Sequence, residues 1–184
     1  MRFNNFVRKD VCGEVKTKYS TMVDLARNIK GGWEGWLQVQ IYLRLNKDGE
    51  VGTQSFTREE YYPGLLTRSD FTFVPTNASN TKTWVELKVL RNEDADTAVK
   101  EFMEDITKIT KNEVKNSIGS EDTLGAILVA PVKADDVING LTSEFIDFER
   151  IYYFVVGDDI SQPQKLSRSS TASGKAAVFY WTVK

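Results

Sequence analysis

The order of apolar and polar positions predicts an alternating α/β chain with one strongly amphipathic helix near its middle. Over residues 95–109 the apolar positions recur at spacings of three and four, which is the period of one helix face. They are Ala95, Ala98, Val99, Phe102, Met103, Ile106 and Ile109. Residues 124–130 form a continuous apolar run, and such a run is typical of a buried central strand.

Three further strands are expected before the long helix, at 51–62, 69–74 and 83–90. In the second, Phe71 and Phe73 alternate with polar residues, and a polar turn over 75–81 separates it from the third. Because the links between these strands are short, we expect antiparallel pairing among them.

The segment 33–45 fits two interpretations, since its apolar residues match a helix face and also alternate in its second half as in a strand. Its length favours a helix. A shorter helix is expected at 21–30, started by a capping box at Thr21 and Asp24 and ended by two glycines. The remaining predictions are a helix at 134–141 and strands at 151–156 and 176–183.

These elements together predict the α/β class, with a mixed central β-sheet flanked by helices on both faces. The length of 184 residues suits a single domain over 1–184. Its parts are an N-terminal helix extension over 1–30, a core over about 33–131 and additional helix and strands over 134–184. A Ser-rich stretch at 161–175 is expected to be a surface loop.

Composition narrows the chemistry that this chain can perform. The chain has no histidine and one cysteine, Cys12, which excludes Ser-His-Asp and Cys-His catalysis, His-metal sites and internal disulfides. No stretch approaches the roughly 20 apolar residues of a membrane span, and the N-terminus lacks an apolar signal segment, so the cytoplasm is the expected compartment. The net charge of −2 argues mildly against nucleic-acid binding.

The candidate chemistry lies in the third predicted strand. Side chains alternate along a strand, so Glu86 and Lys88 share a face while Leu87 points into the core. Asp70 lies in the preceding predicted strand, and pairing of the two strands would bring it beside Glu86. Two carboxylates that close repel each other unless a cation joins them, and Mg²⁺ or Mn²⁺ prefers such oxygen ligands.

Asp70 followed at a distance by Glu86-x-Lys88 resembles the PD-(D/E)XK motif of restriction-endonuclease-like nucleases. The order helix, three strands, helix, strand (α-β-β-β-α-β) is similar to the core of that superfamily over about 33–131. Glu34 occupies the place of the acidic residue that many members carry on the first helix. The sequence departs from the motif at Ser69, where the family has proline.

The resemblance implies a site for Mg²⁺ or Mn²⁺ and in-line attack of water on a phosphodiester. Asp70, Glu86 and Glu34 would hold the metal, with the carbonyl of Leu87 as a further ligand, and Lys88 would orient the attacking water. Candidates for substrate contacts are Gln38, Lys100 and Arg58.

The resemblance therefore predicts a metal-dependent nuclease whose partner is nucleic acid, with DNA favoured and no membrane partner. An RNA nuclease and a catalytically inactive binding module on the same fold remain as alternatives. A homodimer is compatible with the fold class by analogy only, since duplex DNA presents two strands.

Overall fold

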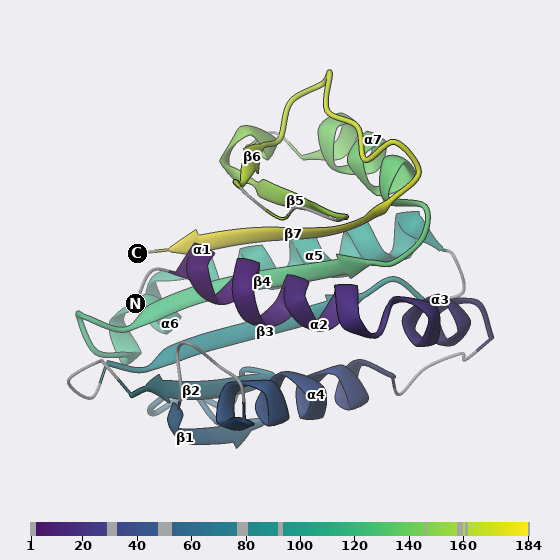
Figure 1. The fold of residues 1–184 in the computed structure, drawn as a ribbon. Coiled ribbons are helices and arrows are strands. Elements are labelled where there is room, and N and C mark those ends of the chain that lie inside the picture. The colour runs from purple at the N-terminus through teal and green to yellow at the C-terminus, as the bar shows by residue number, and fades with distance from the viewer. Residues whose placement is uncertain are drawn as a thin grey trace.

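The protein is built around one seven-stranded mixed sheet with helices on both faces (Figure 1). The computed structural model describes residues 3–28, 33–47, 53–76, 81–91, 94–145, 147–157, 160 and 162–183. Across the sheet the strand order is β1-β2-β3-β4-β7-β5-β6. The strands are β1 (Thr53–Arg58), β2 (Phe71–Pro75), β3 (Thr83–Val89), β4 (Thr123–Ala130), β5 (Tyr152–Val156), β6 (Gln164–Lys165) and β7 (Ala176–Val183).

Strand directions follow the lengths of the connections. Strands β1, β2 and β3 are antiparallel neighbours, as their short links predict. Strand β3 pairs with β4 in parallel through the crossover helix α5 (Ala95–Thr110). The last strand, β7, inserts antiparallel between β4 and β5, so the sheet is mixed.

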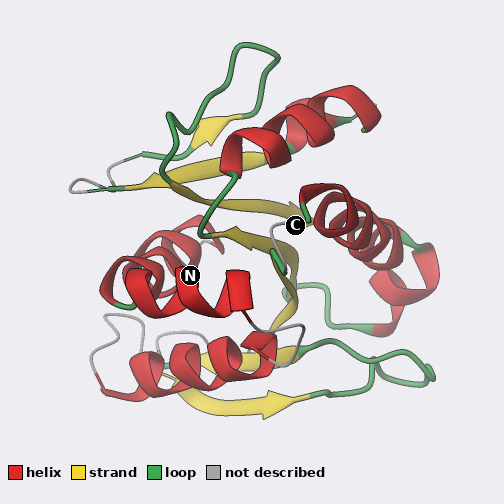
Figure 2. Cartoon of the chain, turned by 90° about the vertical axis from the view of Figure 1, so that its right-hand side faces the viewer, coloured by secondary structure: helices red, strands yellow, loops and turns green. Residues whose placement is uncertain are grey.

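Two groups of helices cover the sheet (Figure 2). One face carries the N-terminal segment and α4 (Trp33–Lys47). On the other face lie α5 and α6 (Asn112–Ser117), and α7 (Ala134–Glu144) packs beside α5. A short 3₁₀ turn, η2 (Phe148–Arg150), precedes β5. In the part of the chain that the structure describes, no helix is both long enough and apolar enough to span a membrane.

Several predicted elements are confirmed. The ambiguous segment 33–45 is the helix α4, and the amphipathic stretch is α5. The apolar run at 124–130 is β4, with seven of its eight residues buried in the sheet interior between the two helix layers. The predictions for β3, α7, β5 and β7 hold to within three residues at each end.

The N-terminal prediction of a single helix over 21–30 is wrong in its start. The chain is helical from Phe3 through α1 (Phe3–Phe6), the π-helical turn η1 (Val7–Val11), α2 (Cys12–Thr17) and α3 (Tyr19–Asn28). Thr21 is therefore the third residue of α3 and not its N-cap, and the two glycines lie outside the described residues. Tertiary packing accounts for the extra helix, because the Phe6 ring centroid lies 4.7 Å from that of Phe73 and 6.4 Å from that of Phe71.

Two predicted strands and the Ser-rich loop also need correction. Strand β1 ends at Arg58 because Glu59 adopts a left-handed conformation with φ of 51°. Strand β2 begins at Phe71, one residue after Asp70. The stretch 161–175 is not all loop, since it contains β6. Of the predicted turn at 75–81, residues 77–80 lie outside the described residues.

Candidate functional site

The site lies where β2 separates from β3. The ladder between these strands covers only 71–73 against 83–85, so the end of β3 has no partner in β2. Asp70 stands at this fork. Its backbone N–H donates to the carbonyl of Val85 at 3.1 Å, and its Oδ2 accepts from the N–H of Leu87 at 2.6 Å. The Asp70 carboxylate thus continues the ladder by one bond and is fixed beside Glu86.

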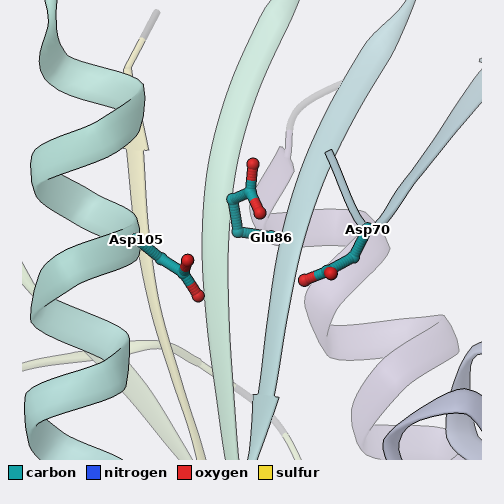
Figure 3. A group of neighbouring side chains, drawn as sticks. All are labelled: Asp70, Glu86 and Asp105. Carbon is teal, nitrogen blue, oxygen red and sulfur yellow. The ribbon is translucent and has the colours of Figure 1, made fainter. Parts of the chain in front are cut away.

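Three carboxylates meet at the fork (Figure 3). One oxygen from each of Asp70, Glu86 and Asp105 lies within 4.8 Å of the other two. Asp70 directly precedes β2, Glu86 comes from β3 and Asp105 from α5 on the adjacent face. Strand pairing predicted the first two as neighbours, whereas Asp105 joins them through helix packing.

Both oxygens of Glu86 have partners. Its Oε1 accepts from the Tyr62 hydroxyl at 2.6 Å, and its Oε2 lies 2.7 Å from Nζ of Lys108 on α5. The Glu86 side chain is 1% exposed. A buried carboxylate needs such donors, because an unpaired buried charge is costly. Tyr62 and Lys108 therefore hold Glu86 in one orientation.

Lys88 connects the two helix layers. Its Nζ lies 3.5 Å from Oδ2 of Asp105 on α5 and 3.9 Å from Oε2 of Glu34 on α4. Both separations exceed the 2.7–3.2 Å usual for an N–H···O hydrogen bond. The Lys88 ammonium is therefore close to both carboxylates, and its protons remain available to a third group.

Burial and mutual repulsion perturb these groups. Burial, with smaller contributions from neighbouring carboxylates, raises the pKa of Glu86 to about 8, of Glu34 to about 7 and of Asp105 to about 6. Burial lowers the pKa of Lys88, but the surrounding carboxylates outweigh it and raise that pKa. Burial and the Glu86 charge together raise the pKa of the Tyr62 hydroxyl. Clusters of perturbed acids are typical of functional sites.

A divalent cation fits this set of donors. Among the described residues, Glu34, Asp70, Glu86 and Asp105 have the ammonium groups of Lys88 and Lys108 and the guanidinium of Arg91 as opposing charges, so the acids outnumber the cations when all are ionised. In addition, Oδ2 of Asp105 is buried and accepts no hydrogen bond from the described residues. A hard cation with oxygen ligands would neutralise the excess charge and satisfy that atom.

No family model, curated protein or solved structure matches this chain. The chemistry of the site is therefore inferred from its own groups. These are carboxylates, ammonium groups and a phenol, in a chain without histidine. Such a set suits binding of a hard cation and of an anionic substrate better than imidazole-based proton transfer.

The other residues predicted from sequence lie around the site. The Gln38 side chain is buried, and its Oε1 accepts from Nε of Arg58 at 2.8 Å, so these two join α4 to the end of β1. The Leu87 side chain is buried in the core, and its backbone N–H donates a hydrogen bond to the Asp70 carboxylate. Lys100 is exposed on α5 and lines a shallow groove with Met103 and Lys111, among others.

Three functional groups were missed from sequence: Asp105, Lys108 and Tyr62. Asp105 did carry a signal, because it falls on the buried stripe of α5 between Phe102 and Ile109, where an apolar residue is expected. Lys108 borders the same stripe. Tyr62 carried no signal, because its contact with Glu86 depends on the path of the loop after β1.

Proposed function

We propose that this protein is a metal-dependent nuclease of the restriction-endonuclease-like type that hydrolyses phosphodiester bonds, with DNA the favoured substrate. The observation that supports this most directly is the position of Lys88 beside three clustered carboxylates. Its Nζ lies 3.5 Å from Asp105, whose carboxylate lies within 4.8 Å of those of Asp70 and Glu86. A cation site with an ammonium group beside it is what hydrolysis of an anionic ester requires.

Asp70, Glu86 and Asp105 would hold Mg²⁺ or Mn²⁺, and Glu34 lies close to them with its Oε2 3.9 Å from Nζ of Lys88. When bound, the cation would supply Lewis-acid activation of water and neutralise charge on the phosphate. The residues of the chain orient the metal ligands. Tyr62 and Lys108 orient Glu86, and the N–H of Leu87 orients Asp70. The ligands are therefore held in place before substrate arrives.

Lys88 is the group expected to contact the reacting atoms. Because its ion pairs are long, its ammonium can donate to a water or to a non-bridging phosphate oxygen without first breaking a hydrogen bond. The carboxylates around it keep it protonated, as its raised pKa indicates. We infer that Lys88 orients the attacking water and stabilises the negative charge that develops on the phosphate.

The proposal is tested by incubating supercoiled plasmid, linear duplex, single-stranded DNA and RNA with the protein in Mg²⁺, Mn²⁺ or EDTA. We expect metal-dependent cleavage by the wild type and a loss of at least about 100-fold in Lys88→Ala. Lys111→Ala, which removes an exposed lysine of the same region, serves as the matched control. Cleavage that persists in EDTA or in Lys88→Ala would contradict the proposal.

The substrates separate the alternatives. Cleavage of RNA alone would select the RNA nuclease. Binding without cleavage of any substrate, in the presence of a metal that raises the melting temperature, would select a binding module on the same fold.

A further inference from the structure

A projecting hairpin stands next to the site and is not needed to build the sheet. The chain leaves β1 at Arg58, runs out on the side of the sheet that carries α5 (Figure 2), and returns to Asp70. We call residues 59–69 the site hairpin. Tyr61 and Arg68 form an isolated antiparallel bridge, and Ser69 N–H donates to Glu60 O at 3.0 Å.

The tip of the site hairpin is an ordered turn. Leu65 N–H donates to Tyr62 O at 2.9 Å, and Tyr62 N–H donates to Thr67 O at 3.0 Å. Pro63 and Gly64 occupy the two central positions, and Gly64 has φ of 73°. Proline followed by a glycine of positive φ is the pattern of a type II turn, which has a defined shape. The backbone at the tip therefore has a defined course, and Leu66 directly follows the turn.

One side chain at this tip is apolar and almost fully in water. Leu66 is 95% exposed, and the neighbouring Tyr61 is 55% exposed. A leucine left in solvent loses the favourable free energy that burial of its apolar surface would give. A turn of defined shape, followed by an exposed leucine near a candidate active site, is typical of a segment that contacts a bound ligand.

The root of the site hairpin is bonded to the site itself. Tyr62 is buried, stacks on Trp84 and donates to Glu86 at 2.6 Å. Lys108 donates to the carbonyl of Arg68 at 2.9 Å and also contacts Glu86. Leu66 is one Cα step, about 3.8 Å, from Thr67, and Thr67 lies across the backbone from Tyr62 at about 5 Å. The Cα atom of Leu66 therefore lies within roughly 9 Å of that of Tyr62, whose hydroxyl contacts Glu86.

We propose that the site hairpin reads the nucleic-acid strand bound in the site, with Leu66 inserted against a nucleobase near the scissile phosphate. Apolar side chains that unstack bases and aromatic or guanidinium planes that stack on them are the usual means of such contact. The Arg68 guanidinium lies 5.3 Å from the Tyr61 ring centroid and is ion-paired with Glu59 at 2.9 Å, so the same hairpin offers a guanidinium plane and an aromatic ring to a base. The inference rests on the proposed function, because it needs a polynucleotide in the site.

The test compares Leu66→Ser with Leu43→Ser, since Leu43 is another exposed leucine, 49% exposed, on α4. Both changes are made in the inactive Lys88→Ala background. Binding of a fluorescein-labelled single strand and of a duplex is followed by anisotropy with Mg²⁺, and an oligonucleotide containing 2-aminopurine reports unstacking. We expect Leu66→Ser to weaken binding about tenfold and abolish the 2-aminopurine signal, and Leu43→Ser to change neither. In the active protein we expect a raised KM with little change in kcat.

Each outcome decides a different point. Equal affinity and equal 2-aminopurine signal for the Lys88→Ala protein with and without Leu66→Ser, together with equal cleavage by wild type and the active Leu66→Ser protein, would overturn the role of Leu66 and leave the proposed nuclease activity standing. A protein that neither binds nor cleaves any polynucleotide would overturn both. A Leu66→Ser protein that changes from dimer to monomer in gel filtration, with unchanged binding of DNA, would assign Leu66 to self-association and overturn the inference.

Discussion

The Lys108 ammonium on α5 lies 2.7 Å from the Glu86 carboxylate on β3, so the central acid of the site has a counterion from a helix. A divalent cation bound by Glu86 would meet a positive charge already in place. Lys108 and a bound metal would therefore compete for the Glu86 carboxylate, and the affinity for the metal depends on the strength of the Lys108–Glu86 ion pair.

Replacing Lys108 by methionine should separate these two effects. Without metal, the variant loses a charge-assisted hydrogen bond to a buried carboxylate, and we expect the free energy of unfolding to fall by about 1–3 kcal/mol. With Mg²⁺ present, the gain in melting temperature should be larger than in wild type, because the competing cation is gone. Thermal melts with EDTA and with Mg²⁺ measure both quantities.

Lys111→Met is the control for Lys108→Met, since Lys111 follows directly after α5 and is exposed. It should change neither the stability nor the response to metal. A Lys108→Met protein whose response to Mg²⁺ is smaller than that of wild type would show that Lys108 supports metal binding instead of competing with it.

Asp105 should be required for metal binding although it lies outside the strand motif. Asp105→Asn keeps the shape of the side chain and removes the charge, so we expect Mg²⁺ affinity to fall at least about tenfold. Because Oδ2 of Asp105 accepts no hydrogen bond from the described residues, the amide should fold normally without metal. Isothermal titration of Mn²⁺ into wild type and Asp105→Asn gives the affinity directly.

The neighbouring exposed acid, Glu104, provides the comparison for Asp105. Glu104→Gln should bind Mn²⁺ as wild type does. Unchanged affinity in Asp105→Asn would remove Asp105 from the site and leave the ligands that the resemblance implies, which are Asp70, Glu86, Glu34 and the carbonyl of Leu87.

The pH dependence of the metal effect follows from the raised pKa values. Burial raises the pKa of Glu86 to about 8 and of Glu34 to about 7, from an ordinary value of 4.5. The folded protein therefore binds these protons more tightly than the unfolded chain. Without metal, their stabilising contribution is complete below about pH 4.5 and is lost as the pH rises through the folded values.

Mg²⁺ binds the ionised carboxylates, so its stabilising effect should grow over the same interval. Melting curves at about pH 5, 7 and 8.5, with Mg²⁺ and with EDTA, measure the difference. We expect the smallest metal-induced shift at the lowest pH and the largest at the highest. A shift that is constant with pH would mean that these carboxylates are not the ligands.

Local sequence patterns predicted the site residues in and beside the strands, whereas tertiary packing determines the position of Asp105. Alternation along β3 places Glu86 and Lys88 on one face, and the short link from β2 brings Asp70 beside them. Asp105 depends on the rotation of α5 against the sheet, which no local pattern fixes. Asp105 lies on the apolar stripe of α5, and this position indicates a functional role only if a buried carboxylate is taken as unusual.

The N-terminal helices show a different limit. Phe3, Phe6 and Val7 lie at helical spacing, but charged and polar residues between them weaken the pattern. Packing against the sheet stabilises the helical conformation of this segment, since Phe6 packs on Phe71 and Phe73. Their helical conformation therefore depends on contacts more than 60 residues away in sequence.

Asp10, in the π-helical turn η1, should make stability depend on pH independently of the site. It is 1% exposed, and its Oδ2 has no hydrogen-bond partner among the described residues. Burial raises its pKa from 3.8 to about 6, against the opposing charges of Arg44 and Lys9. The stability it contributes is complete below about pH 3.8 and is lost as the pH rises through 6. Asp10→Asn should therefore be increasingly more stable than wild type between these values, by up to about 1–3 kcal/mol near neutrality.

Gly125 and Phe3 should behave as a coupled pair, because the glycine in β4 leaves room for the phenylalanine ring. A Cβ built at Gly125 would lie 2.1 Å from the Phe3 ring, far inside van der Waals contact. Gly125→Ala should therefore displace Phe3 and lower the free energy of unfolding by about 1–3 kcal/mol. In a Phe3→Ala background the same change should cost much less, because the clash is absent. Urea unfolding of the two single variants and the double variant gives the coupling energy, and additive losses would mean that Phe3 does not pack on β4 in solution.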